Sequence, residues 1–419
     1  DLLSPRVASL EGMQLAWSPG TPNGPMTGEL IIIPDLEDST AFQQWLPQVT
    51  GKFVLISMMQ PSGRPDYNLK EYATPELYEK LIEERERATV DWNRRISRTG
   101  LDRRTLPLAL EKAGAAGILM SNWSGGFGVN KIFGAFTKSI PTLDISLEDY
   151  GMLFRMVENG DNPTIRVLAE SRDLGRVPVF NTIAEMKGTE KPEEYVILSA
   201  HFDSWDGGTG ATDNATGTMV MMEAMRILKK IYPNPKRTIL AGHWGGEEQG
   251  LNGSRAFVED NPEIVKNMQA LFNQDNGTGR VVNITGQGFL HAYEYLGNWL
   301  QELPEEIRGH IRTDFPGIPG SGGSDFASFV AVGAPAFNLS SLSWDYSTYT
   351  WHTNRDTYDK IVFDEVRNNV ILTAILAYMA SEDPERTSRE KRMMPLDPDT
   401  GKPRPWPAQR PLVREGGFE

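Results

Sequence analysis

The sequence contains no cysteine in 419 residues. This absence excludes disulfide bonds, thiolate nucleophiles and cysteine-ligated zinc sites, and it selects no cellular compartment. Long hydrophobic runs are missing too: the longest largely apolar stretch, residues 371–380, is too short to cross a bilayer, so we expect no membrane span. No secretory signal is visible, yet the chain begins at Asp1 rather than at methionine. We therefore expect a processed protein, secreted or periplasmic, whose signal peptide has been removed.

The sequence also lacks clustered basic residues. It has 42 lysines and arginines against 56 aspartates and glutamates, a formal net charge of −14, and no long basic stripe of the kind that phosphate binding requires. We expect no nucleic-acid partner. Signature loops of other chemistries are missing as well: there is no GxSxG elbow, no Walker loop and no GxGxxG turn after the first strand.

The chain length predicts two domains, each with its own core. The fold class is α/β: residues 177–381 alternate strand and helix patterns, which predicts a three-layer domain with a mostly parallel central sheet. Residues 28–176 read as an inserted α+β domain, and a long charged helix is expected within it at 75–98. Residues 1–27 are expected to pack on the second domain. The proline-rich tail, 382–419, is expected to wrap or to stay mobile.

Titratable residues follow successive predicted strands of the second domain. The buried strand 195–200 leads directly into His201, and open α/β sheets bind their ligands at this end of the strands. The residues of this kind, each at a strand end or in the loop after it, are His201, Asp203, Asp213, Glu247, Glu248, Asp275 and His352. We expect them to meet at one edge of the sheet.

Two histidines and several carboxylates without a thiol form a ligand set that suits zinc. Two ions about 3.5–4 Å apart need one carboxylate that bridges them and separate terminal ligands for each. Asp213 is predicted to be the bridge, because its loop lies nearest the end of the sheet. His201 and Asp275 would then complete one ion, and Glu248 and His352 the other.

Two acids of this set are left for other roles. Glu247, adjacent to a ligand, is expected to act as general base towards the attacking water. Asp203, two residues after His201, is expected to hold that imidazole in one tautomer. A lone HxD or Glu-Glu pair would be weak evidence, functional in roughly one case in ten. Their joint occurrence in order strengthens the prediction, whereas His243, His291 and His310 lack acidic loops and are expected to be structural.

The stretch HFDSWDGGTGATDNATG at 201–217, with the acids and His352 that follow it, resembles the co-catalytic di-zinc exopeptidases, metallopeptidase family twenty-eight, and is most similar to their carboxypeptidase Q group. The resemblance covers about residues 177–380. It implies the same five ligands, two Zn²⁺ ions per chain, and Glu247 as the base. Residues 28–176 look like a protease-associated domain, with GKFVLI, ALEKAGAAGILM and IPTLDIS in the expected order.

The resemblance implies hydrolysis of peptide bonds near a free terminus of short peptides or dipeptides, and relatives with this insertion are often homodimers. Ser324 and Asp325 are similar to the family's Ser-Asp-His turn and are expected to contact substrate. Some relatives carry a tyrosine directly before the last histidine that stabilises the oxyanion. Here Trp351 stands there, so Tyr346 or Tyr349 is expected to serve.

Two other functions remain open at this stage. A receptor-like binding protein would keep the fold and lose the chemistry, but all five ligand positions and the base are chemically competent here. A glutaminyl-cyclase-like acyltransferase would hold a single zinc and lack the inserted domain, so metal stoichiometry separates it from a peptidase. The choice among aminopeptidase, dipeptidase and carboxypeptidase depends on pocket-lining side chains that the sequence does not identify.

Overall fold

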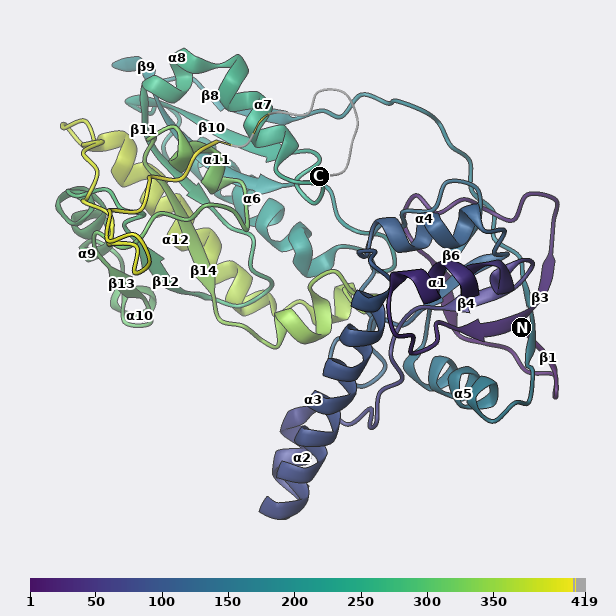
Figure 1. Ribbon diagram of the computed structural model, residues 1–419. Coiled ribbons are helices and arrows are strands. Elements are labelled where there is room, and N and C mark those ends of the chain that lie inside the picture. The colour runs from purple at the N-terminus through teal and green to yellow at the C-terminus, as the bar shows by residue number, and fades with distance from the viewer. Residues whose placement is uncertain (410, 412–419) are drawn as a thin grey trace. The chain divides into compact units, whose positions relative to one another are not determined.

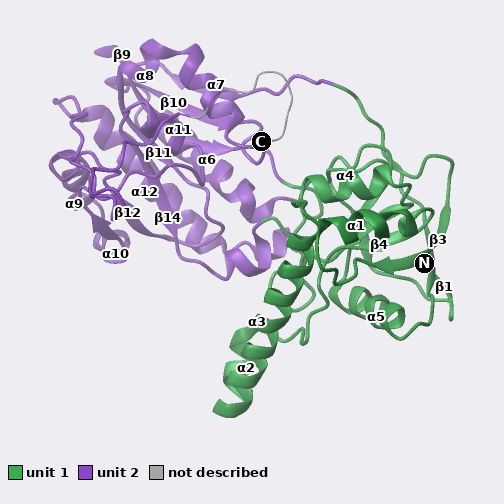
Figure 2. Cartoon of the chain, in the orientation of Figure 1, with its two compact units in different colours: residues 1–175, 205–208, 352–355 green, residues 176–204, 209–351, 356–419 purple. Residues whose placement is uncertain are grey.

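The computed structural model describes residues 1–409 and 411, and it divides the chain into two compact units (Figures 1 and 2). Unit 1 comprises residues 1–175 with two short segments from later in the chain, 205–208 and 352–355. Unit 2 comprises 176–204, 209–351 and the chain from 356 onward. Each unit has its own seven-stranded sheet. Among the described residues, no helix combines the length and the apolarity needed to cross a bilayer.

The sheet of unit 2 is mixed and mostly parallel at its centre. β14, β11, β9 and β10 are neighbours that run parallel, while β8 pairs antiparallel with β10 and β12 antiparallel with β14. In sheet order, the strands are β13 (Arg312–Asp314), β12 (Val281–Thr285), β14 (Ala336–Ser341), β11 (Met268–Asn273), β9 (Lys191–His201), β10 (Arg237–Trp244) and β8 (Thr182–Met186). Because the central strands are parallel, their carboxyl ends lie along one edge.

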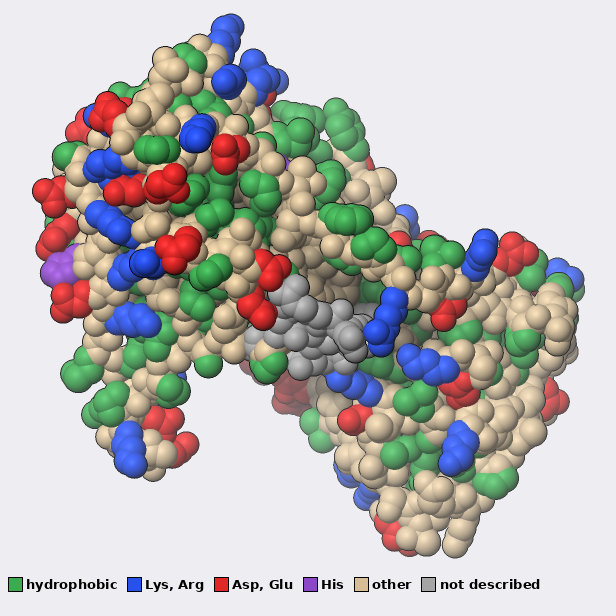
Figure 3. Space-filling model, turned by 90° about the horizontal axis from the view of Figure 1, so that it is seen from above, with side chains coloured by type: hydrophobic (Ala, Val, Ile, Leu, Met, Phe, Trp, Pro, Cys, Tyr) green, Lys and Arg blue, Asp and Glu red, His purple; other side chains and the backbone are tan. Residues whose placement is uncertain are grey.

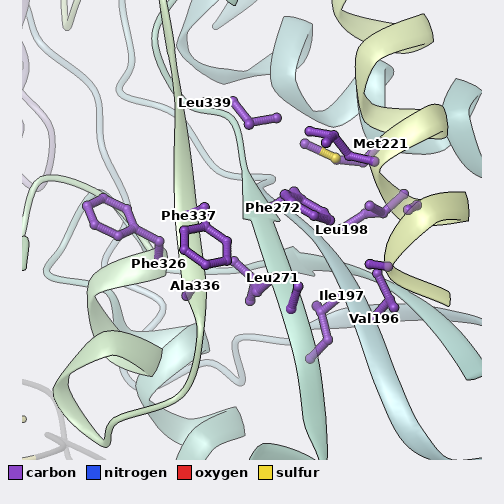
Figure 4. Packing of buried hydrophobic residues seen from close by; sticks show 14 of the residues in the cluster. Val196, Ile197, Leu198, Met221, Leu271, Phe272, Phe326, Ala336, Phe337 and Leu339 are labelled. Atoms are coloured by element: carbon purple, nitrogen blue, oxygen red, sulfur yellow. The ribbon is translucent and has the colours of Figure 1, made fainter. Parts of the chain in front are cut away.

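Helices cover both faces of this sheet. α6 (Thr216–Ile231) and α12 (Phe363–Glu382) pack on each other and on β9 and β10, whereas α7 (Asn252–Asp260) and α11 (Phe326–Ala331) form a second pair. Figure 4 shows Met221 of α6 and Phe326 of α11 on opposite sides of the strands between them. The shorter helices of unit 2 are α8 (Pro262–Lys266), α9 (Asn298–Gln301) and α10 (Glu305–Arg308). Coverage of both faces explains why the central strands read as continuous apolar runs instead of alternating ones.

The sheet of unit 1 has a parallel centre with antiparallel edges. In sheet order, its strands are β1 (Leu2–Ser4), β7 (Thr164–Val167), β3 (Met26–Ile32), β4 (Phe53–Leu55), β5 (Gly117–Met120), β6 (Thr142–Ile145) and β2 (Gly12–Gln14). Its helices are α1 (Ser39–Trp45), α2 (Asp66–Tyr72), α3 (Pro75–Arg98), α4 (Thr105–Lys112) and α5 (Leu147–Glu158). The charged helix expected at 75–98 is α3, and none of its residues is buried.

The N-terminal segment lies in unit 1. β1 pairs with β7 and β2 pairs with β6, so this segment supplies both edge strands of the sheet. The prediction that residues 1–27 pack on the second domain is therefore wrong. The segment joins unit 1 through backbone pairing, because an unpaired edge strand leaves N–H and C=O groups without partners. The sequence did not reveal this pairing, since strands of three residues carry little local signal.

The described part of the C-terminal tail packs on unit 2. Phe289 forms an isolated antiparallel bridge with Lys391, and the Trp406 indole packs edge-to-face against Phe289 with ring centroids 5.7 Å apart. The Trp406 Nε1 donates a hydrogen bond to the Val330 carbonyl at 2.8 Å. Of the two outcomes expected for the tail, the structure shows wrapping over the residues that it describes.

One buried carboxyl group in unit 1 predicts a pH-dependent stability. Asp144 in β6 accepts hydrogen bonds from the Asn122 backbone N–H at 2.9 Å and from Asn130 Nδ2 at 2.5 Å. Burial nevertheless raises the pKa of Asp144 to about 7. The folded state therefore binds this proton more tightly than the unfolded state, and the contribution to stability is present at low pH and is lost as the pH rises towards 7.

We therefore expect the unfolding free energy of the wild type, minus that of Asp144→Asn, to fall as the pH rises from 4.5 to 7, by about 1 kcal/mol per pH unit. Urea titrations at several pH values measure this difference. Asp161→Asn, which removes an exposed acidic side chain from the same unit, is the matched control. A pH-independent difference for Asp144→Asn would contradict the prediction.

Candidate active site

His201 is the last residue of β9 and is 1% exposed. Its Nδ1 lies 2.9 Å from the backbone carbonyl of Asp203, so the turn after the strand orients the imidazole. Its Nε2 points at two carboxylates, 3.1 Å from Asp275 Oδ1 and 3.3 Å from Asp213 Oδ1. A histidine oriented at one ring nitrogen by a backbone oxygen, with the other nitrogen turned towards acids, has the arrangement of a metal ligand.

His201, Asp213 and Asp275 converge from three loops of unit 2. Each offers one ligand atom, and these atoms all lie within 4.8 Å of one another. Asp213 lies in the turn that precedes α6, and Asp275 follows β11, the strand beside β9. All three side chains are buried. The structure thus brings together three of the predicted ligands within one unit.

Asp356 holds the Asp213 loop and was not predicted. Its carboxylate accepts the backbone N–H groups of Thr212 at 2.8 Å and of Asp213 at 2.9 Å, and its own backbone carbonyl accepts the N–H of Thr209. It is 3% exposed. The only sequence feature that could have indicated Asp356 is its position four residues after His352, in the same polar loop.

Asp203 has a different role from the one expected. Its side chain lies 3.8 Å from His201 Nδ1, beyond hydrogen-bonding distance, so it does not fix the tautomer directly. Its two oxygens instead accept the backbone N–H groups of Glu247 at 3.0 Å and Glu248 at 3.2 Å. Asp203 therefore orients the loop that carries the expected base. The backbone carbonyl of Asp203 lies closer to Nδ1 than the Asp203 carboxylate does, and it orients the imidazole.

Glu247 lies in the tight turn after β10, where Gly246 has a φ of +67° and the carbonyl of Glu247 accepts the N–H groups of Gly250 and Leu251. Its side chain is 9% exposed. Burial raises the pKa of Glu247 well above its usual range, and the charge of Asp275 raises it further, against the effect of His201. Glu247 is thus a buried acid next to the ligand trio, as a general base requires.

The pKa values of the buried titratable groups in this region are strongly shifted by burial and by one another. Burial raises the pKa of Asp213 to about 6, against the hydrogen bond from His201. Burial opposes protonation of His201, but the charges of Asp275 and Glu247 outweigh it and hold its pKa well above normal. The acids of the group raise one another's pKa, since Asp275 acts on both Asp213 and Glu247. Several buried acids that meet at one place suit the binding of a cation.

Ser324 and Asp325 are both buried. Ser324 Oγ accepts a hydrogen bond from Asn273 Nδ2 at 2.8 Å, within a buried network that continues to Ser199 and Trp244. Asp325 is 0% exposed, directly before α11, and burial raises its pKa to about 7. Neither side chain is open to a substrate here, contrary to the expectation. Order in the sequence does not reveal which side of a loop faces solvent.

Tyr346, one of the two candidate tyrosines, lies beside the ligands Asp213 and Asp275. Burial raises the pKa of Tyr346 well above normal, and the charges of Asp213 and Asp275 raise it further. Its phenol therefore stays protonated and can donate a hydrogen bond. Gly277, at a φ of +83°, permits this placement, since a Cβ there would lie 2.7 Å from the tyrosine ring. Tyr349 lies in the same turn, Tyr346–Thr350, and is half-buried.

His352, the remaining predicted ligand, belongs to the short segment 352–355 that groups with unit 1. Its backbone carbonyl accepts the Ile132 N–H at 2.7 Å, and the next residue, Thr353, forms an isolated bridge with Lys131. Its ring packs edge-on against Phe133, with ring centroids 5.3 Å apart. The position of this histidine is thus set by contacts within unit 1.

Comparison with known proteins agrees with this geometry. The family model described as Peptidase family M28 matches residues 181–377, which span every strand of unit 2 and the residues that unit 2 contributes to the candidate site. Residues 181–377 belong to peptidase family M28. The prediction of an exopeptidase of this family is confirmed.

Three relatives illustrate the similarity. Carboxypeptidase Q of Mus musculus is 26% identical over 399 residues, which cover 93% of this chain and 74% of the relative. Among solved structures, a peptidase M28 precursor from Shewanella amazonensis superposes with a TM-score of 0.65 at 23% identity, over 92% of this chain and 81% of that one. A zinc aminopeptidase from Bacillus subtilis gives a TM-score of 0.58 at 19% identity, over 90% and 81%.

These similarities extend beyond the matched M28 segment into unit 1, because each covers at least 90% of the chain. The two structural matches establish a shared α/β fold. On the face shown in Figure 3, acidic and basic side chains are interspersed.

Proposed function

We propose that this M28 chain is a zinc-dependent exopeptidase that hydrolyses a peptide bond near a free terminus of short peptides or dipeptides. The observation that carries the proposal is the buried convergence of His201, Asp213 and Asp275 at the carboxyl edge of the sheet, with Glu247 beside them. The names of the carboxypeptidase and aminopeptidase relatives support the reaction class.

The residues fit a divalent zinc ion. One imidazole nitrogen and two carboxylate oxygens within 4.8 Å of one another are the donor types that zinc prefers. We propose that Asp213 is shared with a second ion, held also by Glu248 and His352; this part rests on the sequence pattern and on the family resemblance. When bound, zinc supplies Lewis-acid chemistry, stabilising negative charge on oxygen.

The protein's own groups supply proton transfer and orientation. Glu247 takes the proton of the attacking water and returns it to the leaving amine, which its buried position allows. Asp203 holds the Glu247 backbone in place, and Asp356 holds that of Asp213. The protonated Tyr346 phenol is proposed as the donor towards the oxyanion, because it lies beside Asp213 and stays un-ionised.

We also propose that unit 1 is a protease-associated domain. The support is the order of its parallel strands β3, β4, β5 and β6, which carry the sequence stretches that prompted the resemblance. Expression of residues 28–170 alone, followed by circular dichroism, would show whether this domain folds independently of the edge strands β1 and β2.

The deciding experiment measures metal content and hydrolysis on the same preparation. We expect two zinc ions per chain, turnover on a panel of dipeptides and aminoacyl anilides, loss of turnover with a chelator, and recovery when zinc is added back. The panel also separates aminopeptidase, dipeptidase and carboxypeptidase activity. Two zinc ions with no turnover on any substrate would favour a receptor-like binding role, and a single ion with acyl transfer would favour the cyclase-like alternative.

A further inference from the structure

β13 is the strand at one end of the unit 2 sheet, beside β12 (Figure 1), and no other described strand pairs with its outer edge. All three of its residues are exposed. The Asp314 carbonyl accepts the Gly286 N–H at 2.9 Å, so the backbone groups of Asp314 point towards β12. Backbone groups alternate in direction along a strand. Those of Thr313 therefore point away from β12, towards the open edge.

The sequence around β13 is complementary to itself. Residues 311–315 read Ile-Arg-Thr-Asp-Phe, with one charge of each sign on either side of Thr313. If the same strand of a second copy lay antiparallel with its Thr313 opposite this one, each Arg312 would face an Asp314. Opposite charges at directly facing positions attract, and two-fold symmetry forms the pair twice. Within the described residues, neither Arg312 nor Asp314 forms an ion pair or a side-chain hydrogen bond.

Charged residues on an edge strand ordinarily prevent pairing with other chains. That role requires charges that repel one another when two copies of the edge meet. The arrangement in β13 does the opposite, because its arginine and its aspartate lie at symmetric positions about Thr313. The chain as a whole has a net charge of −14, which opposes association of two copies. Local complementarity of this kind is therefore needed for any stable contact between them.

An apolar pocket of unit 2 lies beside the same edge. Its volume is about 190 Å³, and it is lined by Ile311, Thr313 and Phe315 together with Tyr293 and Leu300. Tyr293 is 59% exposed, and its ring packs edge-to-face against Phe315 with ring centroids 5.9 Å apart. Alternate residues of a strand share one face, so the pocket borders the pairing edge directly. A second copy paired at this edge would cover part of this apolar surface, which adds burial to the hydrogen bonds.

We propose that two copies of this chain form a homodimer through the β13 edge, paired antiparallel about Thr313. The N–H and C=O groups of Thr313 exchange two hydrogen bonds with those of the second copy, and an Arg312–Asp314 pair lies on either side. The two unit 2 sheets then form one continuous sheet. This surface lies wholly within unit 2 and uses none of the proposed catalytic groups, so the proposal does not depend on the proposed function.

Charge reversal tests the pairing. We expect the wild type to dimerise with a Kd on the order of 1 µM, measured by sedimentation equilibrium. Arg312→Asp and Asp314→Arg each place like charges opposite one another, and each should weaken the dimer by about tenfold or more. The double variant restores opposite charges and should dimerise as the wild type does. A mixture of the two single variants should form a heterodimer, because all facing pairs are then opposite in sign. Lys230→Asp, an exposed position on α6, is the matched control and should dimerise normally.

Cross-linking provides a second readout that does not depend on the charged residues. The chain contains no cysteine, so Thr313→Cys introduces a single thiol. Directly facing residues of this kind have Cα atoms about 5.5 Å apart, within the range that a disulfide spans. We expect mild oxidation to link two Thr313→Cys chains and to leave the exposed control Lys230→Cys unlinked.

Two results would overturn the proposal. One is a wild type that stays monomeric at concentrations well above the expected Kd. The other is a dimer that both charge-reversal variants leave intact and that Thr313→Cys does not link, since such a dimer uses another surface. Either result would leave the proposed peptidase function unaffected.

Discussion

We expect Glu247→Gln to lower kcat by about 10²- to 10⁴-fold on any substrate that the wild type hydrolyses, with two zinc ions retained. Glutamine has nearly the same shape as glutamate and keeps a hydrogen-bond acceptor, but its amide does not act as a base and cannot take up the proton of the water. Glu247 is buried next to the ligand trio, and no other acid outside the proposed ligands occupies the same loop. Steady-state kinetics and metal analysis on one preparation measure both quantities.

The matched control is Glu263→Gln, an exposed glutamate in α8 that makes only a surface pair with Lys266. It should leave kcat and metal content unchanged. A kcat for Glu247→Gln within threefold of the wild type would contradict the assignment of the base. Loss of zinc from that variant would show instead that Glu247 is a ligand.

Asp213→Ala is expected to have an effect of the same order through a different cause. Asp213 Oδ1 lies 3.3 Å from His201 Nε2, and Asp213 is proposed to be shared by both ions. Its removal should therefore reduce zinc content below one ion per chain and lower kcat/KM by at least about 10³-fold, since activation of water depends on the metal. Zinc analysis after dialysis, together with the dipeptide assay, checks both outcomes.

Asp206→Ala is the control for this variant, because Asp206 is an exposed acid seven residues earlier in the same stretch. It should keep both ions and full activity. If Asp213→Ala kept two ions, the bridging role would be wrong. Saturating zinc in the assay tests whether the defect is one of affinity, since weakened binding is rescued by excess metal and a missing bridge is not.

The principal elements of unit 2 could be read from the sequence because each carries a strong local pattern. The apolar run before His201 is a strand, and the periodic stretch after Asp213 is α6. Parallel strands end at one edge, so residues after successive strands were expected to meet, and His201, Asp213 and Asp275 do. The strands β8, β12 and β13 were not predicted, because strands of three to five residues carry little apolar periodicity, and β8 and β13 are in addition the edges of the sheet.

By itself the sequence determined the family, the ligand candidates and the expected base, since each depends on residue types in a fixed order along the chain. Only the tertiary structure decided which groups support them: the carboxylate of Asp203 holds the Glu247 loop, Asp356 holds the Asp213 loop, and Asp325 lies fully buried. It also decided that residues 1–27 complete the sheet of unit 1. These outcomes depend on hydrogen bonds between residues distant in the chain, and local sequence patterns carry no record of such partners.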